Sequence, residues 1–440
     1  MRQSRFRVIA AVAAFAAFLA GCGGGSADDG GSADSPTDPK SVSGDITVLT
    51  HRTDLVQDKT FEKYKAEFNK LYPNVKVTVQ GITSYEGDVK VRMNGSNYGD
   101  VLMIPGALAR SDYPKYFAPL GDSATLAKKY RYTDFTTFKG KVYGITPNGN
   151  ATGFVYNKAV WKQAGVTAPP TTPEEFITAL KAIKPKTSSI PYYTNYHDAW
   201  PVGGWYGALG SATCDPDALT KLATDTDPWG AGKELNIIDS LLFDVVKEKL
   251  VEPDPTTTNW ENSKNLIATG KIATMWLGSW AVTQMQDAAK KAGTNPDDIG
   301  IMSFPGQKDG KFCPISGPDY NQAVSLHSKH KAAARAWLDW FADKSGFAQS
   351  QGGIPVLREG QLPASLGDYA TQGVEFIELK QDKGAVVNDV DKAGEVGLTT
   401  PDYRQHLVDV ARGAAPGTLP DSFAELTKKW DEGLKTAGSR

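Results

Sequence analysis

Hydrophobic and polar positions in the first part of the chain follow the spacing of strands and helices in turn. Asp45–Thr50 is predicted to be a strand, and Asp58–Tyr72 a helix, because its apolar residues recur at spacings of three and four. Alternate valines at 75–79 predict a second strand, and the continuous apolar run Val101–Ile104 suits a buried parallel strand. This order predicts a doubly wound α/β unit, in which ligands bind beyond the carboxyl ends of the strands.

The second half of the chain is rich in amphipathic helices. Thr172 and Glu175 form a capping box at the start of one predicted helix. Gly270–Trp280 reads as a strand that enters a helix, and Asn321–Leu326 as a further strand. The spacing of apolar residues predicts further helices over Glu234–Leu250, Trp260–Thr269, Lys329–Ala342 and Ser422–Leu434.

A loop-like stretch lies between two short predicted strands near the middle of the first half. Residues 143–145 end the first of these strands, and residues 154–156 begin the second. Pro147–Gly153 between them is rich in Pro, Gly and Asn. Such residues let a backbone change direction, so this stretch is expected to cross between two bodies as an irregular segment.

Five motifs occur in a consistent order along the chain. They are F-N-x-x-Y-P-x-V at 68–75, G-D-V at 99–101, Y-N-K followed by A-G and P-x-T-x-E-E-F at 156–176, G-K-I-A-T-M with G-S-W at 270–280, and I-G-I-M-S-F-P-G at 299–306. Together they resemble the extracellular solute-binding proteins of carbohydrate-type ABC importers. The resemblance covers roughly residues 45–435, nearly the whole chain after its first segment.

The resemblance implies an α/β fold of two interleaved lobes, of the periplasmic-binding-protein type, hinged at crossing segments with a ligand cleft between the lobes. Residues 147–153, 299–306 and 344–356 correspond to the three crossings. The expected first lobe is therefore 45–150 with 304–344, and the expected second lobe is 151–303 with 345–440.

Residues 1–44 are expected to lie outside both lobes. Three arginines precede the apolar run Val8–Ala20, which is too short to span a bilayer, and L-A-G-C ending at Cys22 matches a bacterial lipobox. Residues 1–22 are therefore interpreted as a lipoprotein signal peptide, with Cys22 as the lipidated residue at the outer face of the cell membrane. Gly23–Gly44 has almost no apolar residues and is predicted to be a flexible tether.

Charge and cysteine content narrow the range of partners. The net charge of −2 gives no reason to expect a nucleic-acid partner. Cys214 and Cys313 are the only cysteines besides Cys22. An oxidising location allows a disulfide between them, and two unpaired cysteines are the alternative. The expected lobe boundaries place these two cysteines in different lobes, where a bridge would restrict closure.

A neutral sugar needs aromatic faces for its C–H surfaces and fixed polar groups for its hydroxyls. The candidate aromatic platforms are Tyr85, Tyr196, Trp200, Trp205, Trp276, Trp280 and Tyr320. The candidate polar groups are Arg52, Asp54, Glu86, Asn148, Asn150, Asn195, His197, Asp198, Asn321 and the backbone at Gly278.

Each candidate also has a structural interpretation. Any of the tryptophans can be a core residue, and Asp54 and Asp198 can cap helices. His197 can be an ordinary loop residue, and Arg52 can pair with a structural carboxylate.

The sequence thus predicts a monomeric, lipid-anchored receptor that closes on a sugar and delivers it to a separate permease. No enzymatic activity, cofactor or metal is expected, since G-x-S-x-G, H-E-x-x-H, C-x-x-C and P-loop motifs are absent. Two alternatives stay open. One is a receptor for a polyamine, peptide or other solute, and the other is a surface glycan hydrolase whose carboxylate pair is visible only in space.

Overall fold

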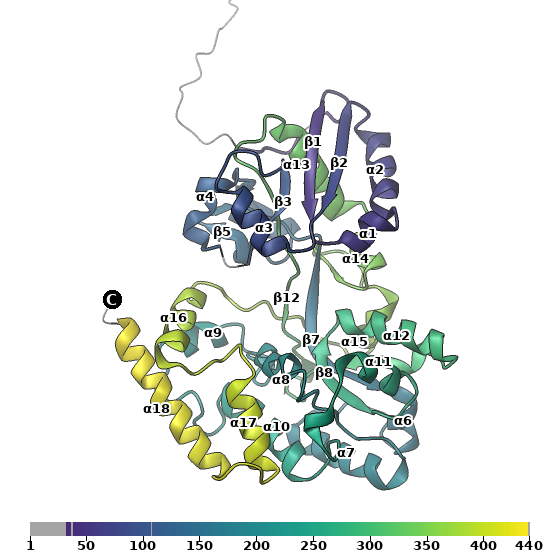
Figure 1. The fold of residues 1–440 in the computed structure, drawn as a ribbon, viewed down its shortest axis with the longest axis vertical. Coiled ribbons are helices and arrows are strands. Elements are labelled where there is room, and N and C mark those ends of the chain that lie inside the picture. The colour runs from purple at the N-terminus through teal and green to yellow at the C-terminus, as the bar shows by residue number, and fades with distance from the viewer. Residues whose placement is uncertain (1–31, 37, 107, 439–440) are drawn as a thin grey trace, which may run out of the picture.

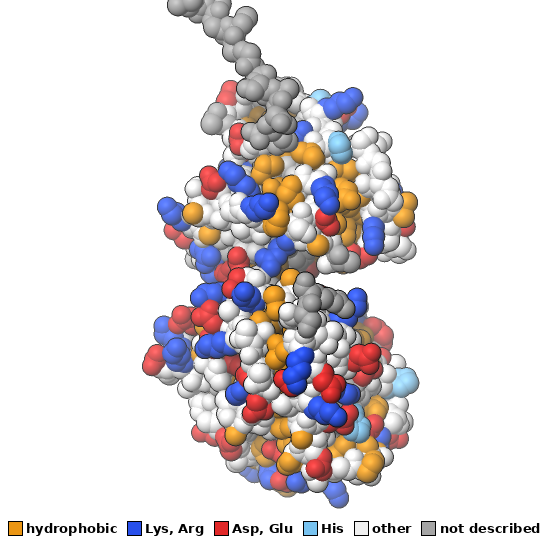
Figure 2. All heavy atoms as spheres, turned by 90° about the vertical axis from the view of Figure 1, so that its left-hand side faces the viewer, with side chains coloured by type: hydrophobic (Ala, Val, Ile, Leu, Met, Phe, Trp, Pro, Cys, Tyr) orange, Lys and Arg blue, Asp and Glu red, His pale blue; other side chains and the backbone are white. Residues whose placement is uncertain are grey.

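The computed structural model describes residues 32–36, 38–106 and 108–438, and it folds into two lobes (Figure 1). The first lobe comprises residues up to 147 and 319–351, the second comprises 158–315 and 359–438, and strands β7, β12 and β14 lie between them. Figure 2 shows the molecule narrowing between the lobes, with charged side chains of both signs gathered there. The lipobox with Cys22 lies outside the described residues.

The first lobe is built on a four-stranded sheet in the order β13-β3-β1-β2, in which only β13 is antiparallel. Ile46 and Val48 of β1 pack in one core cluster with helices α2 and α13, and Leu49 of β1 packs in another with helix α3. Helices therefore cover both faces of the sheet, and the doubly wound pattern predicted for this region is confirmed. The elements are β1 Gly44–Thr50, α1 Thr53–Gln57, α2 Thr60–Leu71, β2 Val75–Gly81, α3 Tyr85–Arg92, β3 Val101–Met103, α4 Tyr113–Tyr116, β4 Gly121–Asp122, α5 Ser123–Lys129, β5 Thr137–Phe138, β6 Lys141–Val142, β13 Gln322–Val324, α13 Lys331–Asp343 and α14 Phe347–Ser350.

The second lobe is mostly helical. Its elements are α6 Lys158–Gln163, α7 Pro173–Lys186, α8 Trp200–Gly203, α9 Ala218–Leu222, α10 Glu234–Lys247, α11 Trp260–Ala268, β8 Thr274–Gly278, α12 Trp280–Ala292, β9 Ile299–Met302, β10 Gln307–Lys308, β11 Lys311–Phe312, α15 Gly367–Thr371, α16 Gly384–Gly394, α17 Asp402–Ala411 and α18 Leu419–Gly438. A fully buried ion pair joins α10 to α17, with Arg404 Nε 2.8 Å from Asp239 Oδ1. Trp229 and Tyr403 also donate to Asp239, so this buried charge is well satisfied.

The segment 147–153 crosses between the lobes as predicted, but it does so as a regular strand rather than as the loop-like stretch that its composition indicates. Residues Asn148–Asn157 form one ten-residue strand, β7, which runs between the lobes (Figure 1). Neighbouring strands satisfy its backbone on both sides, and its glycines serve close packing rather than a turn. A Cβ at Gly149 would collide with the Tyr132 ring, and one at Gly153 would collide with Met302 O.

The other two crossings also differ from prediction. Residues 299–306 stay in the second lobe, where β9 pairs with β7 and Phe304 is buried, and the second crossing is β12, Ser316–Pro318. At the third crossing β14, Ile354–Pro355, runs back along β7, and Leu357 then bridges Tyr130 in the first lobe. The predicted boundaries at 304 and 345 are therefore wrong. Buried apolar contacts hold Phe304 in the core of the second lobe and Phe347 in the core of the first lobe, so each crossing comes later in the chain than predicted.

Part of the predicted tether belongs to the first lobe. Ala33 and Val42 are buried, and Ala33 N donates to Pro119 O at 3.0 Å. The buried Arg335 guanidinium donates to Ala33 O at 2.6 Å. Ala33 thus fills a gap in the first lobe, and its carbonyl oxygen satisfies the buried guanidinium of Arg335. A prediction from composition alone overlooks this role of a single small residue.

Cys214 and Cys313 form a disulfide, with their Cα atoms 5.3 Å apart. Both cysteines lie in the second lobe, so the expectation that they belong to different lobes is wrong. The bridge packs against Ile315 and Ile377. It therefore joins segments within one lobe and leaves lobe closure free.

We expect the disulfide to stabilise the folded state of the second lobe beside the cleft. It closes a loop with a sequence separation of 99 residues, for which the chain-entropy estimate is about 4–5 kcal/mol as an upper value. Cys214→Ser/Cys313→Ser should therefore lower the thermal unfolding midpoint to that of the reduced protein. A reductant should have no further effect on the double variant. Equal midpoints for oxidised, reduced and variant protein would contradict this role.

Candidate ligand-binding cleft

A cavity of about 410 Å³ lies between the lobes, over the middle of β7. Asn150, Ala151 and Thr152 of β7 form its floor, Phe135 reaches it from the first lobe, and Trp280 reaches it from the second. Its lining also includes Trp200, Pro201, Gly204, Gly207, Trp276, Leu277, Gly278, Ile315, Ser316, Gly317, Pro318, Leu379 and Gln381. All of these residues are uncharged, and most of the lining is apolar or aromatic.

Three tryptophans meet at one side of this cavity. The Trp200 and Trp280 ring centroids are 6.0 Å apart, and Trp260 lies 5.1 Å from Trp200 and 5.8 Å from Trp280. Trp200 is 44% exposed although it is part of this cluster. We call Trp200, Trp260 and Trp280 the tryptophan cluster. The rings are inclined to one another by 41–78°, so the cluster presents ring faces and edges at the cavity side, and such faces suit the C–H surfaces of a sugar ring.

The turn before helix α12 is fixed to the cavity floor. Ser279 N donates to Ala151 O at 2.7 Å, and Ala151 N donates to Ser279 Oγ at 3.0 Å. These two bonds hold the start of α12 against β7 and present Trp280 at the cavity. A Cβ at Gly278 would collide with the Trp280 indole, so a glycine is needed there.

A second group of polar and aromatic residues lies at the carboxyl ends of the first-lobe strands. The His51 and Tyr320 rings are 4.5 Å apart, with Tyr85 near both. Burial lowers the pKa of His51 below its ordinary 6.5, against the opposing effect of the Asp319 carboxylate. Burial also raises the pKa of Tyr320.

The charged first-lobe candidates are already paired. Arg52 makes two hydrogen bonds to Asp54, at 2.9 and 2.6 Å, and a third to Gln351 Oε1 at 2.7 Å. The Arg52 hydrogen bonds lower the pKa of Asp54. Glu86 accepts from Gly106 N at 3.0 Å. These groups hold the loops of the first lobe in place.

The cavity brings together one third of the predicted site residues. Asn150, Trp200, Trp276, Gly278 and Trp280 line it. The first-lobe candidates do not line this cavity; these are Arg52, Asp54, Tyr85, Glu86, Tyr320 and Asn321. Tyr85 is buried, and its hydroxyl donates to Met103 O at 3.1 Å.

Three predicted residues lie in the second lobe away from the cavity. Trp205 is buried among core aromatics, and its Nε1 donates to Tyr192 Oη at 3.0 Å. Tyr196 donates to Asp409 on α17 at 2.9 Å. His197 lies on an exposed loop with its backbone N–H bound to Thr258. These three side chains lie outside the cavity lining, and their role in ligand binding stays a prediction.

Two further candidates are structural as well. Asn148 is buried beside Gly353 at the hinge, and its amide is not on the cavity surface. Asp198 Oδ2 accepts from Trp260 N at 2.7 Å, in the first turn of α11, which matches its capping interpretation. Asp198 thereby holds one member of the tryptophan cluster.

Several residues at the cavity carry no local signal in the sequence. Phe135, Ile315, Leu379 and Gln381 are scattered over the chain, and none belongs to a motif or to an aromatic run. Trp260 was assigned only to a helix start. Their role depends on which segments the fold brings side by side.

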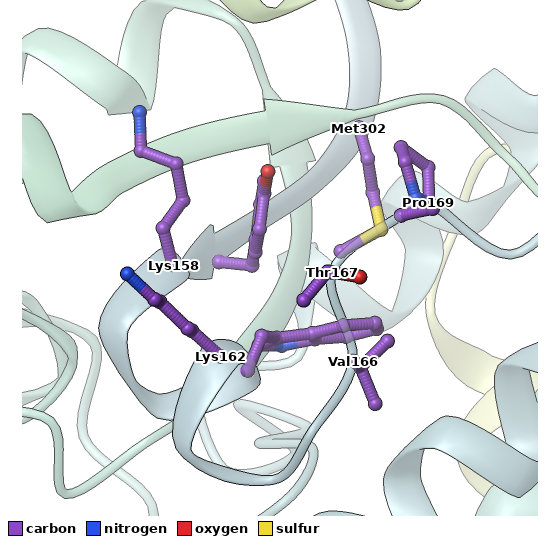
Figure 3. Close-up of a pocket in the computed structure, with 9 residues that line it drawn as sticks. Lys158, Lys162, Val166, Thr167, Pro169 and Met302 are labelled. Carbon is purple, nitrogen blue, oxygen red and sulfur yellow. The ribbon is translucent and has the colours of Figure 1, made fainter.

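Other cavities lie within the second lobe. One of about 330 Å³ is lined by Lys158, Lys162, Trp161 and Met302, with the two lysine chains extending on the side opposite Pro169 (Figure 3). Lys158 is paired there with Asp368 at 3.3 Å. Within the part of the chain that the structure describes, no group of three metal-ligating side chains occurs, and no helix is long and apolar enough to cross a membrane.

Comparison with known proteins agrees with this two-lobed arrangement. A family model described as bacterial extracellular solute-binding protein matches residues 52–346. The chain belongs to this family. The resemblance read from the sequence motifs is therefore confirmed, as is the prediction of a binding protein rather than an enzyme. This solute-binding protein thus takes up a ligand without transforming it.

Solved structures of other family members are similar over most of their length. A manno-oligosaccharide-specific solute-binding protein of Bifidobacterium animalis subsp. lactis, in complex with mannotriose, is 31% identical with a TM-score of 0.76, covering 91% of this chain and 96% of its own. A second binding protein of an ABC transporter from the same organism, in complex with mannobiose, is 33% identical with a TM-score of 0.76 and the same coverage.

Among curated proteins, the multiple sugar-binding protein of Streptococcus mutans is 24% identical, covering 67% of this chain and 70% of its own length. The melibiose/raffinose/stachyose-binding protein of Bacillus subtilis is 28% identical, covering 67% and 68%.

The buried His51 gives the folded protein a pH dependence. Because its folded pKa lies below 6.5, the unfolded chain binds more protons as the pH falls below about 6.5, and stability decreases until the folded pKa is reached. The unfolding midpoint of the wild type should therefore fall more steeply than that of His51→Asn between about pH 7.5 and pH 5. Parallel midpoint curves for the two proteins would show that His51 is solvated in the folded state.

Proposed function

We propose that this solute-binding protein is the receptor of an ABC importer, that it captures an oligosaccharide between its lobes by hinge closure, and that it delivers the sugar to a separate permease. The observation that carries this proposal is the tryptophan cluster at the edge of an uncharged cavity between the lobes. Rings stack on such a surface, while Asn150 and Gln381 supply amide groups for hydroxyls.

The relatives support a carbohydrate ligand. The two Bifidobacterium proteins are described in complex with mannotriose and mannobiose, and the curated relatives are named as sugar-binding proteins. These names concern the relatives, and the uncharged cavity is the independent argument from this chain. A neutral ligand leaves no unpaired charge when closure excludes water.

The charge distribution argues against a polyamine. A polyamine site needs several converging carboxylates, yet the described residues that line the cavity include no Asp or Glu. The three candidate carboxylates, Asp54, Glu86 and Asp198, are bound to Arg52, Gly106 N and Trp260 N. The same lining lacks the carboxylate pair that glycoside hydrolysis requires.

The proposal includes attachment to the membrane surface. The lipobox at residues 19–22 supports cleavage between Gly21 and Cys22, with Cys22 kept as the lipidated N-terminal residue of the mature chain. The receptor would then act as a monomer at the outer face of the membrane, held near its permease by the lipid.

Substitution of Trp200 should weaken sugar binding much more than it lowers the stability of the ligand-free protein. A sugar at about 100 times its dissociation constant should stabilise the wild type by about 2.7 kcal/mol. Trp200→Ala should weaken binding by about tenfold or more, with little change in the ligand-free melting temperature, because this side chain is 44% exposed.

Leu71→Ala is the matched control, since Leu71 is 40% exposed on the first lobe. A panel of oligosaccharides, polyamines and peptides tested by thermal shift and calorimetry distinguishes the alternatives. Stabilisation by a polyamine or a peptide, with none by sugars, would refute the sugar assignment and keep the receptor fold.

A further inference from the structure

The order of the strands under the cavity defines two opposite sides of its floor, and different residues stand at each side. Ile377 bridges Ile315 just before β12, β12 pairs with β7, and β7 pairs with β8. Since neighbouring strands lie about 4.8 Å apart, these three steps give a floor about 14 Å across. Leu379 and Gln381 therefore stand at one side of the floor, and Gly278 and the tryptophan cluster stand at the other.

The side next to β12 is closed by residues of both lobes. Phe135 reaches over Gly317, with its Cζ 3.9 Å from where a Cβ of Gly317 would lie. Beside it, Gln381 N donates to Asp134 Oδ2 at 2.9 Å, and Arg110 donates to Gln381 O. We call Phe135, Ile315, Leu379 and Gln381 the end wall. Hydrogen bonds between the lobes hold it shut.

The end wall has rigid support from behind. Ser316 N donates to Ile377 O at 2.8 Å, and Ile315 packs against the Cys214–Cys313 disulfide. A Cβ at Gly210 would collide with Leu379, so Leu379 rests directly on the backbone there. A second tie between the lobes lies just before it, where Tyr132 N donates to Glu378 Oε2 at 2.8 Å. Moving the wall would break several of these contacts together.

The opposite side has no such closure. Trp200 remains 44% exposed, and Trp260 is half-buried with Lys264 Nζ 5.0 Å from its ring centroid. These rings extend the aromatic surface from the cavity toward solvent. A chain lying on the floor can therefore continue past Trp200.

We propose that the cleft binds a linear oligosaccharide end-on, with one terminal ring against the end wall and the rest of the chain leaving over the tryptophan cluster. This inference rests on the proposed function and adds the ligand's orientation and terminus. Recognition is then of a chain end, so a bulky substituent on the terminal ring at the wall is rejected. The same substituent at the other terminus projects into solvent and is tolerated.

The test uses linear manno-, malto-, cello- and chito-oligosaccharides with the full mature chain in calorimetry. Each sugar that binds is compared untagged, with a p-nitrophenyl aglycone at its reducing end, and with a benzylidene acetal on its non-reducing ring. The tag at the terminus that projects into solvent should change the dissociation constant by less than about threefold. The tag on the ring at the end wall should raise the dissociation constant by about a hundredfold.

Variants locate the closed end. Phe135→Ala should reduce the penalty of the rejected tag to about tenfold, because it opens the end wall, and Leu379→Ala serves as a second variant of the same wall. Both side chains are half-buried, so the folded state is checked by thermal melting. Trp260→Ala is the control at the open side and should leave the penalty unchanged while weakening all the sugars alike.

The outcomes separate this inference from the proposed function. Tolerance of both tags, rejection of both tags, or equal effects of Phe135→Ala and Trp260→Ala on the rejected tag would each overturn end-on binding while the sugar receptor stands. Failure of every untagged sugar to bind would overturn the proposed function, and the inference with it.

Discussion

Both the hinge and the ligand cavity depend on the backbone pairing of one strand, β7. Its first four residues pair with β12 and β14, and its last six residues pair with β8 and β9 in the second lobe. Asn150 and Thr152 on the same strand form the cavity floor. Hinge and floor are therefore one element, so bending the hinge changes the shape of the site directly. That coupling is what a receptor that closes on its ligand requires.

The charged side chains near the cleft already have partners, so closure of the lobes does not bury an unpaired charge. Arg52, Asp54 and Gln351 satisfy one another in the first lobe, and Arg110, Asp134 and Gln381 do so between the lobes. Burying an unpaired charge on closure would cost several kcal/mol. With these groups already paired and the cavity lining uncharged, ligand contacts need to offset mainly the ordering of the lobes and the loss of water.

The sequence predicted the elements better than it predicted their placement. The first-lobe strands and helices follow from local apolar spacing. G-S-W marks the turn that carries Trp280, and the long-range Ser279–Ala151 bonds fix this turn at the cavity. The loop-like interpretation of Pro147–Gly153 was wrong because pairing with β12, β14 and β8 overrides its turn-like composition. Trp205 failed because a tryptophan in an aromatic-rich loop looks the same whether its ring faces the core or the cleft. Phe135 and Leu379 could not be found, since only tertiary contacts bring them to the site.

Contacts within the second lobe explain why one side of the cleft can be rigid while the two lobes still move relative to each other. The buried Arg404–Asp239 pair joins α17 to α10, and the disulfide joins residues 214 and 313, so the segment before Leu379 rests on a fixed body. The contacts of Gln381 and Glu378 with the first lobe lie close to the hinge strands, where rotation produces the least displacement. Closure therefore moves the first lobe mostly over the tryptophan cluster, far from these ties. The side that moves most is also the side where the proposed sugar chain leaves, so closure can clamp ligands of different length on one common end.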